Sequence, residues 1–170
     1  APVKPGADPV SPDAVGARAR DMLLEALRKR PEVVLDLDGK EADPTQAVAE
    51  LKRRGIKGYE VTLRVLRLDR AIRPPPAGKK FRLLERNAKL SLVGTTFPGE
   101  FLALGGDGES TVQIDVGAQV SATQERDVLD DALQDAIGQA VSQAMRKLLT
   151  GPMKPPKDPP RRKAPVAPKK

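Results

Sequence analysis

The chain contains no cysteine and no histidine. Without these side chains it can form no disulfide, no thiolate or imidazole metal site, and no Ser-His-Asp or Cys-His catalytic group. An enzyme built on this sequence would have to use carboxylates, lysines or a hard metal ion. The lack of cysteine is compatible with the cytosol and with an oxidising periplasm, so it does not identify the compartment.

Aromatic residues are also scarce, at 2% of 170 residues, and tryptophan is absent. The core must therefore be aliphatic, built from the leucines, valines, isoleucines and alanines within the 39% hydrophobic content. No apolar run approaches the roughly 18 to 20 residues needed to cross a bilayer, so no transmembrane segment is expected.

Positive charge is abundant but concentrated at one end. The net charge is +7, and residues 154–170 contain five Lys and two Arg against one Asp, which is +6 and leaves 7 − 6 = +1 for the rest. The same segment is rich in proline, which predicts a disordered, extended tail over residues 152–170. Its cations are Lys154, Lys157, Arg161, Arg162, Lys163, Lys169 and Lys170.

These tail cations are the candidate contact residues. They could reach anionic lipid headgroups, cell-wall polymers, acidic proteins or nucleic acid, each adding on the order of 1 kcal/mol near an anionic surface. Nucleic acid is the less favoured partner, because the arginines of residues 53–70 (RRGIKGYEVTLRVLRLDR) lack the set of aromatic neighbours that stacks bases. A solubilising linker is the alternative interpretation of the tail.

Composition divides the chain into three segments. Residues 1–11 are rich in Pro, Gly and Ala and predict a disordered leader, the start of a processed chain whose secretion signal has been removed. Residues 12–151 are expected to form a single α+β domain. Residues 152–170 form the tail.

Two helices are indicated in the first third of the domain. Residues 11–12 (Ser-Pro) and 43–44 (Asp-Pro) each place a capping side chain before a proline at the first helical position. The first helix is stopped by Pro31, and the second ends at Gly55. Between them, the apolar run of residues 32–37 (EVVLDL) predicts a buried strand.

Period-2 alternation over residues 59–65 predicts a longer strand. The apolar phase then changes to Leu66 and Leu68, which indicates a β-bulge. Residues 105–110 (GGDGES) lack the ending and the helix of a phosphate-binding loop and are interpreted as a hairpin turn. Three further strands, joined by short connections typical of an antiparallel meander, are indicated at residues 81–93, 96–104 and 111–120.

A long amphipathic helix is indicated over residues 123–149, ended by glycine and proline at 151–152. The resulting order is α-β-α-β-β-β-β-α. The sequence therefore predicts an α+β fold: a mixed sheet with an antiparallel meander, packed by two shorter helices and the long C-terminal helix. The expected apolar stripe of that helix is Leu129, Ala132, Leu133, Ala136, Ile137, Ala140, Val141, Ala144, Met145 and Leu148.

Residues 13–150 resemble a recurring module of the bacterial cell envelope. The resemblance is carried by AVGARARDMLLEALRKR, by AVAELKRRGIKGYEVTLRVLRL, in which a helix ends in a glycine turn and feeds a strand that starts with Tyr, and by FLALGGDGESTVQIDV. The group includes the amino-terminal domain of the translocation protein TolB, the curli secretion lipoprotein CsgG and the penicillin-binding-protein activator LpoB. The resemblance implies a periplasmic or envelope-associated module. The chain lacks a lipobox cysteine and a CsgG-like pore-forming segment, so neither lipid anchoring nor pore formation is implied.

A second resemblance points to a different class of protein. The stretch VVLDLDGKEAD is similar to the first motif of haloacid-dehalogenase-like phosphatases, in which Asp36 would be the nucleophile and Asp38 the general acid, with magnesium. Three features argue against it. Lys40 stands where that family has Thr, the acidic pair at 130–131 lies inside a helix, and a meander does not supply parallel βαβ units.

We therefore expect a non-enzymatic interaction or assembly module of the cell envelope, without catalytic residues, metal ligands or a cofactor. It would bind other envelope proteins through a sheet edge and the long helix, with the basic tail as an electrostatic tether. Self-association is compatible with this expectation. The alternatives are a magnesium-dependent phosphatase that uses Asp36 and Asp38, and a nucleic-acid binder that uses the tail.

Overall fold

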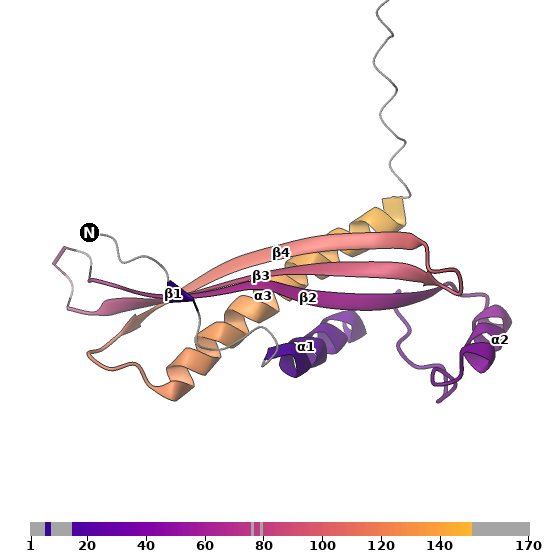
Figure 1. Cartoon of the computed structure of the whole chain (residues 1–170), viewed down its shortest axis with the longest axis horizontal. Helices are drawn as coiled ribbons and strands as arrows, with labels where there is room; N and C mark the ends of the chain where they lie inside the picture. Colours follow the sequence, from indigo (N-terminus) through magenta and orange to yellow (C-terminus); the bar gives the residue numbers. More distant parts are fainter. Residues whose placement is uncertain (1–5, 8–14, 76, 79, 151–170) are drawn as a thin grey trace, which may run out of the picture.

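The structure, a computed structural model, describes residues 6–7, 15–75, 77–78 and 80–150. Three long strands lie side by side, α1 and α3 pack on one face of them, and α2 lies at one end (Figure 1). The α+β class, with two shorter helices and a long C-terminal helix, is confirmed. The elements in chain order are β1 (Gly6–Ala7), α1 (Gly16–Arg28), α2 (Pro44–Arg54), β2 (Gly58–Arg73), β3 (Arg82–Phe97), β4 (Leu102–Val116) and α3 (Ala122–Thr150).

The sheet has the order β1-β2-β3-β4 and every pair in it is antiparallel. The mixed sheet expected from the sequence is therefore wrong for the described residues. The bulge expected after Val65 is confirmed by a register shift between Val65 and Arg67. Within the leader, Gly6 and Ala7 pair with Arg70 and Asp69 instead of being disordered. The rest of the leader, with the Ser-Pro helix start, lies outside the described residues.

The hairpin turn expected at residues 105–110 is wrong. These residues lie inside the continuous strand β4, and the chain reverses at residues 98–101, after a cis Phe97–Pro98 bond. Two strands thus replace the three expected after residue 80. The physical reason lies in packing: a Cβ at Gly106 would meet the Ala140 carbonyl oxygen at 2.1 Å, so these glycines allow close approach of α3.

The strand expected at residues 32–37 is also wrong. A turn forms at each end, because the Val33 N–H donates to the Arg30 oxygen at 3.1 Å and the Lys40 N–H to the Leu37 oxygen at 3.2 Å. Between the turns the chain has no strand partner, and Val34 is 55% exposed.

The ends of α2 follow the expected chemistry, whereas α1 begins at Gly16 after Val15, which provides no side-chain capping hydrogen bond. The Asp43 side chain accepts hydrogen bonds from the backbone N–H groups of Thr45 and Gln46, and Gly55 ends α2 in the left-handed conformation with φ 66°. Before α3, Ser121 Oγ accepts from the Gln124 N–H at 3.1 Å while the Gln124 side chain accepts from the Ser121 N–H at 3.0 Å. This reciprocal pair is a capping box, which fixes the start of α3.

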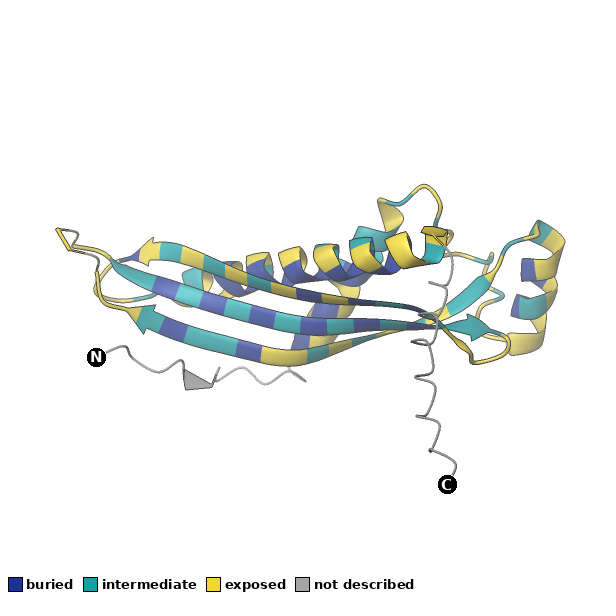
Figure 2. Cartoon of the chain, turned by 90° about the horizontal axis from the view of Figure 1, so that it is seen from above, coloured by how far each residue is buried: buried dark blue, intermediate teal, exposed yellow. Residues whose placement is uncertain are grey.

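The core lies between α3, α1 and the inner face of the sheet. Buried residues of α3 face the strands and exposed ones face away (Figure 2). All expected stripe residues are buried except Leu148, which is partly buried and packs against the same cluster. The central strand β3 contributes Ala88, Leu90 and Leu92, at 0 to 2% exposure. The opposite face of the sheet carries no helix in the described part of the chain (Figure 2).

Candidate functional site

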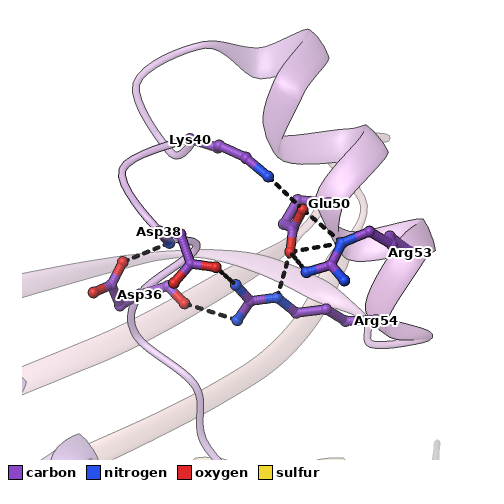
Figure 3. A network of polar contacts seen from close by, with 6 residues as sticks. All are labelled: Asp36, Asp38, Lys40, Glu50, Arg53 and Arg54. Carbon is purple, nitrogen blue, oxygen red and sulfur yellow. Dashed lines mark hydrogen bonds and ion pairs between the residues drawn. The ribbon is translucent and has the colours of Figure 1, made fainter.

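The tail cations, from Lys154 to Lys170, lie outside the described residues, so their contacts remain a prediction. The other residues with a proposed chemical role are Asp36 and Asp38, which lie in the segment before α2, with Asp38 in a turn (Figure 3). The Asp38 N–H donates to Asp36 Oδ1 at 2.7 Å, and the Asp38 carboxylate pairs with Arg54. Nowhere in the described chain do three or more acidic side chains form a group that could hold a metal ion. With an antiparallel sheet, the phosphatase alternative also lacks the parallel units that it requires.

Glu50 is the centre of this polar network, and the sequence analysis did not single it out. It is 3% exposed and accepts hydrogen bonds from Lys40 at 2.8 Å, from Arg53 and from Arg54 at 2.6 Å (Figure 3). The hydrogen bonds from Arg53, Lys40 and Arg54, in that order, hold the pKa of Glu50 far below its ordinary value, although burial opposes them. A glutamate on the inward face of α2, followed by arginines at i+3 and i+4, was the available signal.

Arg67 and Arg73 of β2 lie on the outer, solvated face of the sheet, whereas Arg70 points to the inner face. On the outer face of the sheet, Arg67 pairs with Asp69 at 2.8 Å and with Glu109 at 3.3 Å. Arg73 pairs with Glu85 at 2.7 Å, and its hydrogen bond lowers the pKa of that carboxyl. Arg67 and Arg73 are therefore each balanced by a carboxylate, and exposed Glu60 and Arg64 on the same face carry opposite charges, so this face has no evident cationic excess for a polyanion.

A second ionic cluster lies on the inner face of the sheet. Glu125, in the first turn of α3, accepts from Arg70 on β2 at 2.8 Å and from Arg86 on β3 at 2.5 Å. Arg86 is 2% exposed. Burial raises the pKa of Glu125, but the hydrogen bonds and charges of the two arginines together outweigh it and lower the pKa. The cluster therefore fastens the start of α3 to two strands.

The two edges of the sheet differ in how they are covered. Along β4, the Asp107 N–H donates to Gln143 Oε1 at 2.6 Å and the Glu109 N–H to Gln139 Oε1 at 3.5 Å, so side chains of α3 cap that edge. Along β2, the pairing with β1 involves only Asp69 and Arg70. In the described part of the chain, the first half of β2 has no strand on its outer side.

An apolar groove of about 470 Å³ adjoins this open stretch of β2. Its walls come from the segment before α2, from the start of β2 and from the last turns of α3. Nearby, the β3–β4 turn exposes Phe101 and Leu102, each at 74%. Groups of exposed apolar side chains beside a groove mark binding surfaces. The apolar lining includes Val33, Leu37, Tyr59, Val61, Met145 and Leu148.

A wider hollow of about 1020 Å³ lies between α1 and α3. It is lined by charges of both signs, including Glu25, Lys29, Asp135 and Arg146. Arg30 crosses it and donates to Ser142 Oγ at 2.8 Å. Its mixed charge gives it no preference for an anionic or a cationic ligand.

In the described residues, no helix has both the length and the apolar character needed to cross a membrane. A scan against protein-family models gives no match. Searches among curated proteins and among solved structures give none either. The resemblance to envelope modules thus stays a prediction.

Proposed function

We propose that this chain is a non-enzymatic protein-interaction module of the bacterial cell envelope. It binds partner proteins at one end of the molecule, through the open first half of β2, the adjoining apolar groove and the last turns of α3. The observation that carries the proposal is the contrast between the two sheet edges. The β4 edge is capped at Asp107 and Glu109 by glutamines of α3, whereas the first half of β2 is left open beside an apolar groove.

An open strand edge and a groove together form a recognised type of protein-binding surface. The edge offers main-chain hydrogen bonds, and the groove accepts the alternate side chains of an added segment and so provides specificity. The exposed Val34, Phe101 and Leu102 extend the apolar surface around the groove. In a partner-bound state these side chains would be removed from water, which favours association.

The location in the envelope is supported by one local feature of the sequence. A helix that ends at Gly55 and feeds a strand starting with Tyr59 resembles the envelope modules named above. The basic tail serves as an electrostatic tether to anionic lipid or cell-wall polymer.

A site-specific cross-linking experiment tests the proposal. A photoreactive amino acid replaces Val34, which is 55% exposed at the groove, and in a matched control it replaces Asp115, which is exposed on the outer face of β4. Each purified variant is irradiated with envelope and with cytoplasmic fractions. We expect discrete adducts from the Val34 position with envelope fractions only. Equal labelling from both positions, or labelling that is as strong in the cytoplasmic fraction, contradicts the proposal.

A further inference from the structure

We propose that the open edge of β2 binds a second copy of the chain. The two β2 strands pair antiparallel about Thr62, which gives a continuous sheet of order β4-β3-β2-β2′-β3′-β4′. This inference rests on the proposed function and narrows it: a second copy takes the main-chain groups of the β2 edge, and other envelope proteins bind the groove and the last turns of α3.

The length of the open stretch fixes the centre of the pairing. β2 begins at Gly58, the bulge interrupts it at Leu66, and β1 occupies the edge at residues 69–70. In a twofold antiparallel pair of identical strands, facing residues have a constant sum. For the stretch from 58 to 66 that sum is 58 + 66 = 124, so Thr62 faces its own copy.

The outer-face charges of β2 are self-complementary in this register. Glu60 faces Arg64′ and Arg64 faces Glu60′, because 60 + 64 is also 124. Both side chains are exposed, and neither forms an ion pair with another described residue. They differ in this from Arg67 and Arg73 on the same strand, which have carboxylate partners. Opposite charges that face each other across an antiparallel pair stabilise it.

The inner-face residues match in the same register. Tyr59 faces Val65′ and Val61 faces Leu63′, so apolar side chains meet apolar ones. All four are only partly buried, whereas Leu90 and Leu92 of β3 are 0 and 2% exposed. A neighbouring strand would cover the side chains that the single copy leaves partly in water.

The capped N–H groups in the middle of β4 disfavour growth beyond two copies. After β2 has paired with β2′, the outer edges of the six-stranded sheet are the two β4 strands. On each of them Gln143 and Gln139 occupy the N–H groups of Asp107 and Glu109. A twofold contact closes on itself, and the capped N–H groups in the middle of each outer edge oppose further edge-to-edge pairing.

The natural absence of cysteine allows a direct test of the register. Thr62→Cys places a single thiol at the twofold axis, next to its copy, and the matched control Arg64→Cys lies on the same strand and face. Two Arg64→Cys thiols would be four residue steps apart, roughly 13 Å, which is beyond disulfide reach. Under mild oxidation we expect covalent dimers from Thr62→Cys and none from Arg64→Cys.

Charge exchange tests the pairing without a cross-link. Glu60→Arg or Arg64→Glu places like charges opposite each other twice in the dimer, so we expect the dimer dissociation constant, measured by analytical ultracentrifugation, to rise about tenfold. The double variant Glu60→Arg/Arg64→Glu restores complementarity and should return the constant close to that of the unmodified chain. Circular dichroism shows whether each variant is folded.

Three results would overturn the inference: a protein that is monomeric at all concentrations tested, equal oxidation of the two cysteine variants, or a double variant that dimerises as weakly as the single variants.

Failure of the dimer is distinct from failure of the proposed function. Labelling from Val34 by an envelope protein can persist in a strictly monomeric chain, which rejects only the dimer. Conversely, Thr62→Cys dimers without any labelling from Val34 support the dimer and reject the partner-binding role.

Discussion

Gly108 of β4 lies against the backbone of Ala136 of α3 so closely that a Cβ at Gly108 would stand 1.8 Å from the Ala136 carbonyl oxygen. Two residues earlier, Gly106 has the same relationship to Ala140. Gly106 and Gly108 are two residues apart and therefore lie on one face of the strand, while Ala136 and Ala140 are about one turn apart on one face of the helix. The two contacts together bring the helix axis close to the strand. This contact also explains how Gln139 and Gln143 of α3 can reach the N–H groups of the β4 edge.

The first prediction concerns this contact. Gly108→Ala forces the backbones of α3 and β4 apart, and we expect it to lower the free energy of unfolding by about 3 kcal/mol, at the upper end of the range for overpacked sites. Urea denaturation measures the change. The matched control is Gly105→Ala, where the nearest atom to an added Cβ is the Leu92 oxygen at 3.7 Å. The control should be neutral or slightly stabilising. If the two variants are equally stable, the close contact is not present in solution.

The second prediction concerns the inner-face cluster. Glu125→Gln removes the negative charge that accepts hydrogen bonds from both Arg70 and Arg86, and the Arg86 side chain is buried, so its interaction with α3 is weakened where water cannot compensate. We expect a loss of about 2 kcal/mol in the free energy of unfolding, less than for a fully buried pair because the Glu125 side chain is 21% exposed. Glu109→Gln is the control: its pair with Lys89 is exposed, so the effect should be much smaller. Equal effects in urea denaturation would contradict a special role for the buried cluster.

Periodicity along the chain was sufficient to predict the helices and the core. The stripe of α3, the Asp-Pro start and glycine end of α2 and the bulge after Val65 all correspond to local patterns whose physical cause is local. The run GGDGES, in contrast, is compatible both with a hairpin turn and with a strand packed closely against a helix. Only the partner distinguishes the two, and α3 follows this run by more than ten residues.

The candidate surface was predictable only in outline. The sequence indicates a sheet edge and the long helix as contact surfaces, but not which edge is open, because that depends on the glutamines of α3 and on β1. The missed role of Glu50 and the wrong strand at residues 32–37 have a related cause. The Glu50 network, and not strand pairing, joins that segment to α2, and a contact between polar side chains leaves no hydrophobic period in the sequence.

The third prediction concerns the Glu50 network. Glu50→Gln weakens the hydrogen bonds from Lys40, Arg53 and Arg54 that hold the segment before α2. Because α2 makes few contacts with the rest of the molecule, we expect faster hydrogen exchange over residues 33–57 and little change in exchange of β3. Hydrogen-exchange mass spectrometry resolves the two regions. The control is Glu41→Gln, an exposed carboxylate. Uniformly faster exchange across the whole chain would show that the network supports the global fold instead.

The fourth prediction concerns pH. Glu50, Glu85, Glu109 and Glu125 all have a pKa held below the ordinary value of 4.5 by cationic partners. A lowered pKa in the folded state gives stability that is present above about pH 4.5 and is lost as the pH falls through the folded values. We expect the urea midpoint to fall steadily below pH 4.5, and to fall less steeply in Glu50→Gln/Glu125→Gln. Burial raises the pKa of Asp130, so its contribution to stability increases as the pH falls and opposes this trend. It is one group against four. An unchanged acid slope in the double variant would contradict the assignment.

The last prediction concerns the tail. Residues 154–170 carry +6 of the net charge of +7, so their deletion leaves a nearly neutral chain. With each cation adding on the order of 1 kcal/mol near an anionic surface, we expect the deletion to reduce binding to anionic lipid vesicles by at least about a hundredfold at low salt. The unfolding transition should be unchanged, because the described core ends with α3. Vesicle co-sedimentation at increasing salt measures the effect, with neutral vesicles as the control.

A variant of the full chain in which Arg161, Arg162 and Lys163 become Gln should show a loss of vesicle binding between that of the deletion and none, because the attraction depends on charge and not on a particular sequence. Binding that survives the deletion would instead assign the membrane contact to the domain, and the exposed Phe101 and Leu102 would be the first residues to substitute.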